Sequence, residues 1–204
     1  MENFPHPNYA IRKTMPSPEK IAGVSLLLNL SGYVDSLVSP TSWHSLQVAC
    51  LGKHIAQMLS CNPYETQSIY WASLLHDVGK AGVPRQILSK PGPLTAEEWR
   101  VMKLHPLIGA NLVRNISLGV PIVSLIQFHQ ERYDGSGYPD GLRGEQIPLG
   151  ARIVAVVDAY DAMTSDRFYR KAFRSKKAVT EIETSSGRDF DPNVIEAFLH
   201  ALYS

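Results

Sequence analysis

The stretch from Ile153 to Asp161 reads IVAVVDAYD, an apolar run with one carboxylate, Asp158, in its interior and a second, Asp161, at its end. Its pattern predicts a long buried helix that begins near Pro148. An ionised carboxylate in such surroundings is costly unless a cation or a strong set of hydrogen bonds holds it. A bound divalent metal removes that cost directly. Asp158 is therefore the first candidate ligand, and other parts of the chain must supply its partners.

Helical periodicity continues on both sides of this run. Apolar residues recur at helical spacing, and several starts carry a proline or a capping signal, such as Thr95 with Glu98 three residues on. The predicted helices begin near residues 18, 42, 64, 96, 106, 120, 148, 175 and 192, with a break expected at Gly32 and a cap at Ser175. Strand alternation is not found in the sequence. The pattern therefore predicts an all-α fold.

Length and composition indicate one ordered domain. The chain has 204 residues, of which 44% are hydrophobic and 19% charged, which excludes a wholly disordered chain. Twenty basic against nineteen acidic residues give a net charge of +1, which argues against binding DNA through bulk charge.

The same composition favours a cytoplasmic protein that does not enter a membrane. No segment reaches the roughly 18 apolar residues needed to span a bilayer, and the N-terminus lacks the pattern of a signal peptide. The two cysteines, Cys50 and Cys61, cannot form a disulfide framework. We expect them to be buried, reduced side chains.

Histidines fall at the ends of the predicted helices. His44 lies near the start of one helix and His105 at the start of another, whereas His76-Asp77 and His129 close two others. Neighbouring helical side chains diverge by about 100°, so His76 can serve one metal while Asp77 bridges to a second. Imidazoles and carboxylates without a thiolate suit iron, manganese or zinc rather than a structural cysteine site.

Each of these residues also has an ordinary structural interpretation. A single histidine such as His44 is more often a capping or hydrogen-bonded core residue than a ligand. Lys80 could be a solvated residue at a helix end, and Asp161 could be either an exposed carboxylate or a partner that orients a ligand. Arg167 and Arg170 could be surface charges. The combination, rather than any one residue, favours a metal site.

Several motifs in a fixed order resemble the HD-GYP family. The chain reads HDVGK at 76–80, HP at 105–106, DGSGYPDG at 134–141 shortly after His129, and DAYDAMTSDR at 158–167. Members of that family are metal-dependent phosphodiesterases of bacterial cyclic di-GMP signalling, a branch of the HD-domain phosphohydrolases. The resemblance covers roughly residues 40–202.

The resemblance implies an HD-type helical bundle with a central binuclear metal site. It places an HD-GYP-like domain at residues 41–204, preceded by an N-terminal arm and helical extension at 1–40. It implies two divalent metal ions, iron or manganese, with zinc, nickel or magnesium as alternatives. The implied ligands are His44, His76, Asp77, His105, His129 and Asp158.

The resemblance also implies roles in catalysis and substrate binding. Asp77 would bridge the metals and Lys80 would lie by the scissile phosphate, so both are candidate catalytic residues. The segment Gly137-Tyr138-Pro139 would lie beside the nucleotide, and Arg167 and Arg170 would hold phosphates or a guanine. The implied reaction is hydrolysis of cyclic di-GMP to pGpG, with GMP as an alternative end product.

Two departures from the family pattern leave an alternative open. Gln130 stands where a second histidine normally ligates metal, and its amide oxygen would be a weak ligand. Pro40 stands where three-metal members carry a glutamate, so a third metal is not expected. The alternative is a weakened domain that acts as a cyclic di-GMP sensor or a protein-interaction module. A different cyclic dinucleotide or a nucleotide monophosphate is a further alternative substrate. The implied protein partners are diguanylate cyclases, sensor domains or a second copy of the chain.

Overall fold

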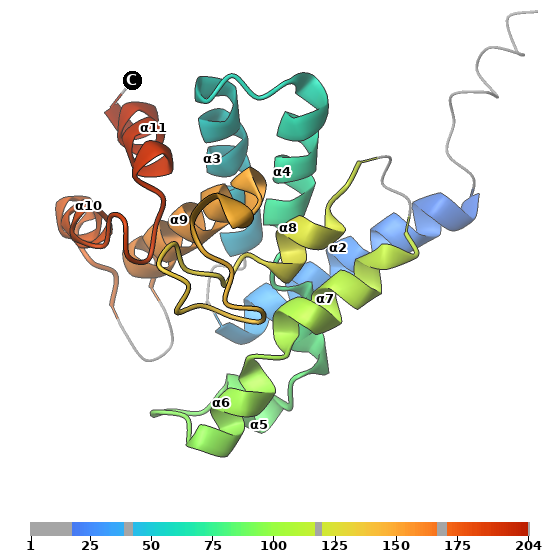
Figure 1. The fold of residues 1–204 in the computed structure, drawn as a ribbon. Helices are drawn as coiled ribbons and strands as arrows, with labels where there is room; N and C mark the ends of the chain where they lie inside the picture. The colour runs from blue at the N-terminus through green and yellow to red at the C-terminus, as the bar shows by residue number, and fades with distance from the viewer. Residues whose placement is uncertain (1–17, 39–42, 117–119, 167–170, 204) are drawn as a thin grey trace, which may run out of the picture.

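The structure, a computed structural model, describes residues 18–38, 43–116, 120–166 and 171–203. Within these ranges the chain is helical and forms no strand (Figure 1). The elements are α2 (Pro18–Val38), α3 (His44–Met58), α4 (Pro63–Leu75), η1 (Val78–Gly82), α5 (Arg85–Leu88), α6 (Ala96–Met102), α7 (His105–Arg114), α8 (Val123–Gln127), η2 (Gly144–Gln146), α9 (Leu149–Thr164), α10 (Ser175–Thr184) and α11 (Pro192–Tyr203). The all-α prediction is confirmed.

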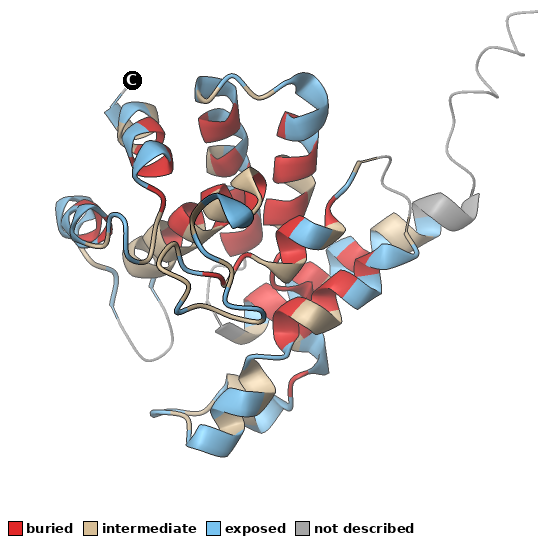
Figure 2. Ribbon diagram, in the orientation of Figure 1, coloured by how far each residue is buried: buried red, intermediate tan, exposed pale blue. Residues whose placement is uncertain are grey.

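The core is built around α9. Ile153, Val154, Val156 and Val157 are fully buried, as the apolar run predicts. Helices α3 and α4 pack against each other and against α9, while α8, α10 and α11 also contact α9. Figure 2 shows the buried residues gathered where these helices meet. Because the helix ends converge on this core, residues at those ends are brought together.

Side-chain caps explain the starts of α4 and α6. Asn62 accepts hydrogen bonds from the backbone of Tyr64 and Glu65, and the Glu65 carboxylate bonds back to the Asn62 amide, forming a capping box. Thr95 and Glu98 form the capping box expected at α6. The helix starts thus depend on short polar contacts that the sequence partly reveals.

Three local predictions are wrong. Helix α2 continues through Gly32 to Val38, because Val34 is fully buried and this packing outweighs the roughly 1 kcal/mol that glycine costs in a helix. Ser175 is the first residue of α10 rather than its cap, and its hydroxyl lies 2.7 Å from the Tyr160 hydroxyl. Cys50 is exposed and Cys61 only partly buried.

Helices α5 and α6 contrast with the rest of the fold. They form a projection at the lower end of Figure 1, beyond α7, and neither contains a buried residue. We call residues 85–102 the projecting arm.

Among the described residues, no helix is both long and apolar enough to cross a membrane.

Candidate metal centre

Four histidines from four helix ends meet in the interior. His44 begins α3, His105 begins α7, and His76 and His129 follow α4 and α8. Their exposed fractions are between 0% and 4%. The rings of His44 and His129 each lie 5.2–5.3 Å from the ring of His76, centroid to centroid. The structure therefore brings together the four histidines that the resemblance implies as ligands.

The Nδ1 atoms of these rings are all engaged. Three of them lie 2.7–2.8 Å from the carbonyl oxygen three residues earlier, pairing His76 with Ser73, His105 with Met102 and His129 with Ile126. Because a carbonyl oxygen only accepts, each Nδ1 carries the hydrogen and leaves Nε2 as the atom able to bind a metal.

Asp161 performs the same task for His44. One of its carboxylate oxygens lies 2.5 Å from His44 Nδ1, so the ring donates there and Nε2 faces the interior. Asp161 is buried, which favours the interpretation as an orienting partner over that of an exposed carboxylate.

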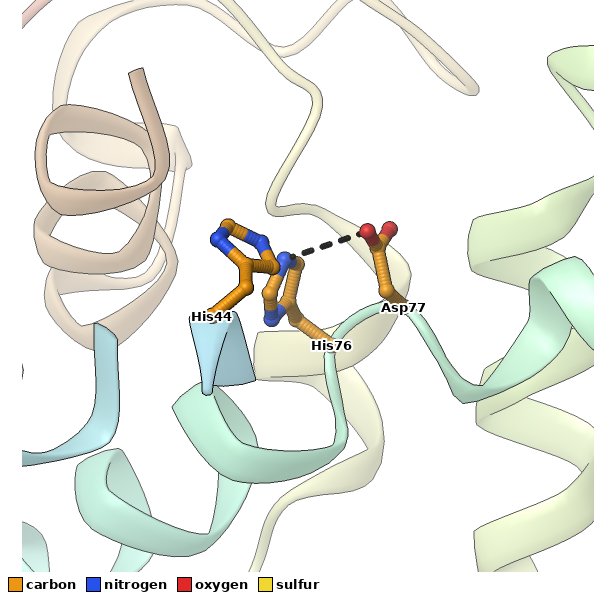
Figure 3. A group of neighbouring side chains, drawn as sticks. All are labelled: His44, His76 and Asp77. Carbon is orange, nitrogen blue, oxygen red and sulfur yellow. Dashed lines mark ion pairs between the residues drawn. The ribbon is translucent and has the colours of Figure 1, made fainter. Parts of the chain in front are cut away.

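Asp77 lies between two sets of histidines. Its Oδ2 lies 3.5 Å from His76 Nε2, whereas its Oδ1 lies 3.5 Å from His105 Nε2 and 4.0 Å from His129 Nε2. Figure 3 shows His44, His76 and Asp77 directed toward a common region. In each of two groups, His44–His76–Asp77 and Asp77–His105–His129, the potential ligand atoms lie within 4.8 Å of one another.

Asp158 completes the first group. Its Oδ1 lies 3.4 Å from His44 Nε2 and 3.7 Å from His76 Nε2. The side chain is 22% exposed, so it lies at the edge of the centre rather than deep within the apolar helix face.

Unsatisfied polar atoms show that these residues fit divalent cations. His44 Nε2, His76 Nε2 and Asp77 Oδ1 are buried and form no hydrogen bond within the described part of the chain. Leaving such atoms without a partner costs roughly 1–3 kcal/mol each. Nitrogen and carboxylate donors around a shared carboxylate are the ligands that first-row divalent metals accept.

Burial keeps two of the histidines neutral. It lowers the pKa of His105 to about 4 and that of His129 to about 3, with further lowering by nearby cationic groups. Both rings are therefore neutral near pH 7, the form that binds a metal.

The other pair behaves in the opposite way. Burial lowers the pKa of His44, but contacts with Asp158 and Asp161 outweigh it and raise the pKa to about 10. The pKa of His76 is also raised, because the charges of Asp77 and Asp158 outweigh burial. In the metal-free protein, these imidazolium charges offset the buried carboxylates.

Lys80 lies directly beside the centre. Its Nζ is 2.5 Å from Asp77 Oδ2, and the side chain is 17% exposed. Burial opposes ionisation of Asp77, but the charges of Lys80 and His76 hold the pKa of that carboxyl well below its usual range. Lys80 is therefore not a freely solvated residue at a helix end.

The glycine-rich segment packs against the centre through Tyr138. The Tyr138 ring centroid lies 6.4 Å from that of His105, and the Tyr138 hydroxyl donates to Gln130 Oε1 at 3.1 Å. At Gly137 a Cβ would lie 2.3 Å from the backbone nitrogen of Arg132, so only glycine fits. Pro139 follows in the same loop, partly buried.

Two carboxylates that position these elements were missed by the sequence analysis. Glu131 is buried, and its Oε1 accepts from the backbone of Asp140 and Gly141 at 2.7 and 3.0 Å, which fixes the glycine-rich loop. Asp35 of α2 is buried too and accepts from the backbone nitrogen and hydroxyl of Ser45, the residue after His44. Only the position of Glu131 directly before the loop could have indicated its role.

A cavity of about 720 Å³ opens from the centre. His105, Lys80, Gln130 and Tyr138 line it near the histidines, and the projecting arm lines its other end. Arg167, Arg170 and Pro40 lie outside the described residues.

Comparison with known proteins agrees with this geometry. A family described as HD domain matches residues 33–194. A cyclic di-GMP phosphodiesterase of Vibrio cholerae is 40% identical over 85% of this chain and 38% of its own length. The cyclic di-GMP phosphodiesterase response regulator RpfG of Xanthomonas campestris is 46% identical over 71% of this chain and 39% of its own length. The chain thus spans less than half the length of these relatives.

Solved structures share the fold. A cyclic GMP-AMP-specific phosphodiesterase of V. cholerae, V-cGAP3, superposes with a TM-score of 0.67 at 19% identity, over 88% of this chain and 48% of that one. The HD domain of the L. monocytogenes phosphodiesterase PgpH gives a TM-score of 0.58 at 14% identity, over 86% and 94%. Together with the motifs and the sequence relatives, these matches establish that the chain belongs to the HD-domain family, in its HD-GYP branch.

Proposed function

We propose that this chain is a metal-dependent phosphodiesterase that hydrolyses cyclic di-GMP to pGpG and on to GMP. The observation that carries the proposal is Asp77, whose two oxygens face two separate sets of buried histidine Nε2 atoms. The relatives at 40% and 46% identity, both named cyclic di-GMP phosphodiesterases, support the choice of substrate.

Under this proposal the ligands divide into two sets that share Asp77. One set is His44, His76 and Asp158, and the other is His105 and His129. Iron or manganese is the expected metal at both positions. When bound, the two cations would supply Lewis acidity to the phosphodiester and lower the pKa of the attacking water.

The residues around the cations would orient and neutralise the substrate. Lys80, already directed at Asp77, would stabilise negative charge on the phosphoryl oxygens. Gly137, Tyr138 and Pro139 would form one wall beside the nucleotide, held in place by Glu131. Arg167 and Arg170 would contact the phosphates or a guanine.

A second candidate function rests on Gln130. Its amide oxygen accepts the Tyr138 hydroxyl, so the amide is engaged with the loop. The second set would then have three protein donors, from Asp77, His105 and His129. A histidine at position 130 would add a fourth. A weakly held second cation would leave a domain that binds cyclic di-GMP, or a protein partner, without hydrolysing it.

Metal content and turnover, measured together on anaerobically purified protein, separate the two functions. Two metal ions per chain with conversion of cyclic di-GMP to pGpG support the phosphodiesterase. One ion or none, with cyclic di-GMP bound intact, supports the sensor. In that case Gln130→His is expected to raise both metal content and turnover; a variant with two ions and no turnover would exclude this explanation.

A further inference from the structure

The cavity beside the metal centre continues onto the projecting arm. Near the histidines its lining is polar, with Lys80, Gln130 and Tyr138. At the other end it is lined by side chains of different character: Ile87, Leu88, Leu94, Trp99 and Met102. One end therefore suits an anion, and the other suits a flat apolar group.

The arm holds this second end in a fixed shape by local bonds. The Lys90 Nζ lies 2.6 Å from Glu98 Oε2, and the same oxygen accepts from the Thr95 backbone at 2.7 Å. Thr95 in turn accepts from the Glu98 backbone. The segment 90–98 is thus closed on itself, and the next residue, Trp99, lies in α6, whose start is fixed by these bonds.

Trp99 is 47% exposed although it is a large aromatic residue that lines a cavity. An exposed indole in the wall of a cavity can serve as a stacking platform for a nucleobase, since every base has a π-face. Lys80 and His105 line the same cavity as Trp99, so a phosphate held at the centre would direct its nucleoside into that cavity.

We propose that the projecting arm is a nucleobase subsite, in which one base of a cyclic dinucleotide stacks on Trp99 while the phosphate lies at the metal centre. The inference rests on the proposed function, since it takes the same substrate. Stacking reads the face of a base rather than its hydrogen-bonding edge. Trp99 would therefore contribute to affinity for purine cyclic dinucleotides in general, and the choice among them would be made elsewhere.

The test compares Trp99→Ala, Trp99→Phe and Tyr64→Ala in the metal-loaded chain. Tyr64 is the matched control, since it is an aromatic residue 55% exposed on α4 and does not line the cavity. KM and kcat are measured for cyclic di-GMP and for 3'3'-cGAMP, and Kd is measured by calorimetry on the metal-loaded chain with a hydrolysis-resistant analogue of cyclic di-GMP.

We expect Trp99→Ala to raise KM and Kd by about 5- to 150-fold, as loss of one stacked base does. The substitution should change KM by a similar factor for both dinucleotides and leave kcat nearly unchanged. Trp99→Phe should restore most of the affinity. Tyr64→Ala should change neither constant.

The subsite would be refuted if Trp99→Ala kept the wild-type KM and Kd. It would also be refuted if Trp99→Ala raised these constants no more than Tyr64→Ala does. A wild-type chain that binds cyclic di-GMP but does not hydrolyse it would contradict the phosphodiesterase and leave the subsite to be judged by Kd. A chain that neither binds nor hydrolyses it overturns both.

Discussion

The metal centre and the projecting arm are built in opposite ways. At the centre the four histidines are nearly inaccessible, and each ring is fixed by a bond from Nδ1, to Asp161 for His44 and to the carbonyl oxygen three residues earlier for the other three. In the arm no residue of α5 or α6 is buried, and the turn is closed by Lys90, Thr95 and Glu98. The contrast teaches that the geometry of the candidate ligands depends on the whole fold, whereas the cavity wall depends on a few local bonds.

Asp77→Ala is the change with the largest expected effect. It removes the carboxylate shared by both ligand sets. The positive charges of Lys80 and His76 then lose the negative charge that faces them. We expect loss of turnover by a factor of about 10³ or more, on the scale seen when a central catalytic group is removed, and at most one bound metal. Circular dichroism should remain helical. Turnover near the wild-type rate would show that the two sets do not depend on Asp77.

Metal affinity should depend strongly on pH. The pKa of His44 in the metal-free chain is raised from 6.5 to about 10, so a cation must displace its proton. Affinity should therefore rise with pH, up to about tenfold per unit for each proton released, until the pH passes about 10. Conversely, the stability that His44 gains from its carboxylates is complete below pH 6.5 and is lost as the pH rises through about 10.

Calorimetry in two buffers with different ionisation enthalpies measures the protons released. Asp161→Asn is the matched variant, because it weakens the contact that raises the His44 pKa and should reduce the release. Binding without proton release between pH 6 and 8 would contradict the charge arrangement described for the centre.

Glu131→Ala tests whether the glycine-rich loop depends on the fold as the histidines do. The substitution leaves the amides of Asp140 and Gly141 without their acceptor, at a cost of about 1.5–3 kcal/mol. We expect a lower melting temperature and a turnover reduced roughly tenfold, with the metal content kept. If metal content falls in proportion to activity, Glu131 stabilises the metal centre itself and not only the glycine-rich loop.

Glu98→Ala should have the smallest effect, because it disturbs only the arm. Loss of the cap and of the Lys90 contact should raise KM for cyclic di-GMP by roughly fivefold or less, with metal content unchanged. Glu97→Ala is the control, as its side chain is 73% exposed and lies 3.8 Å from Arg100. Equal effects of the two substitutions on KM would show that the Glu98 contacts with Lys90 and Thr95 do not hold the cavity wall in shape.

The candidate ligands of the metal centre were easier to predict from the sequence than the residues that hold the surrounding elements in place. His76, Asp77, His105 and His129 could be identified because they fall at helix ends in motifs of fixed order, and the fold brings those ends together. For Glu131 the one signal was its position directly before the glycine-rich loop. Asp35 could not be identified, because its partner Ser45 lies on another helix whose position depends on tertiary packing. The continuation of α2 through Gly32 was missed for the same reason, since burial of Val34 decides it. The place of Trp99 in the cavity wall was missed because a single exposed tryptophan carries no periodic signal.

Asp35 has a consequence for how distant motion could reach the candidate metal centre. It joins α2 to the backbone of Ser45, directly after His44, while α2 also contacts α4 and η1. A rotation or axial shift of α2 would therefore reorient the first turn of α3 and alter the angle of the His44 ring. Any event that repositions this helix would tune the candidate centre's affinity for its cation without touching the substrate.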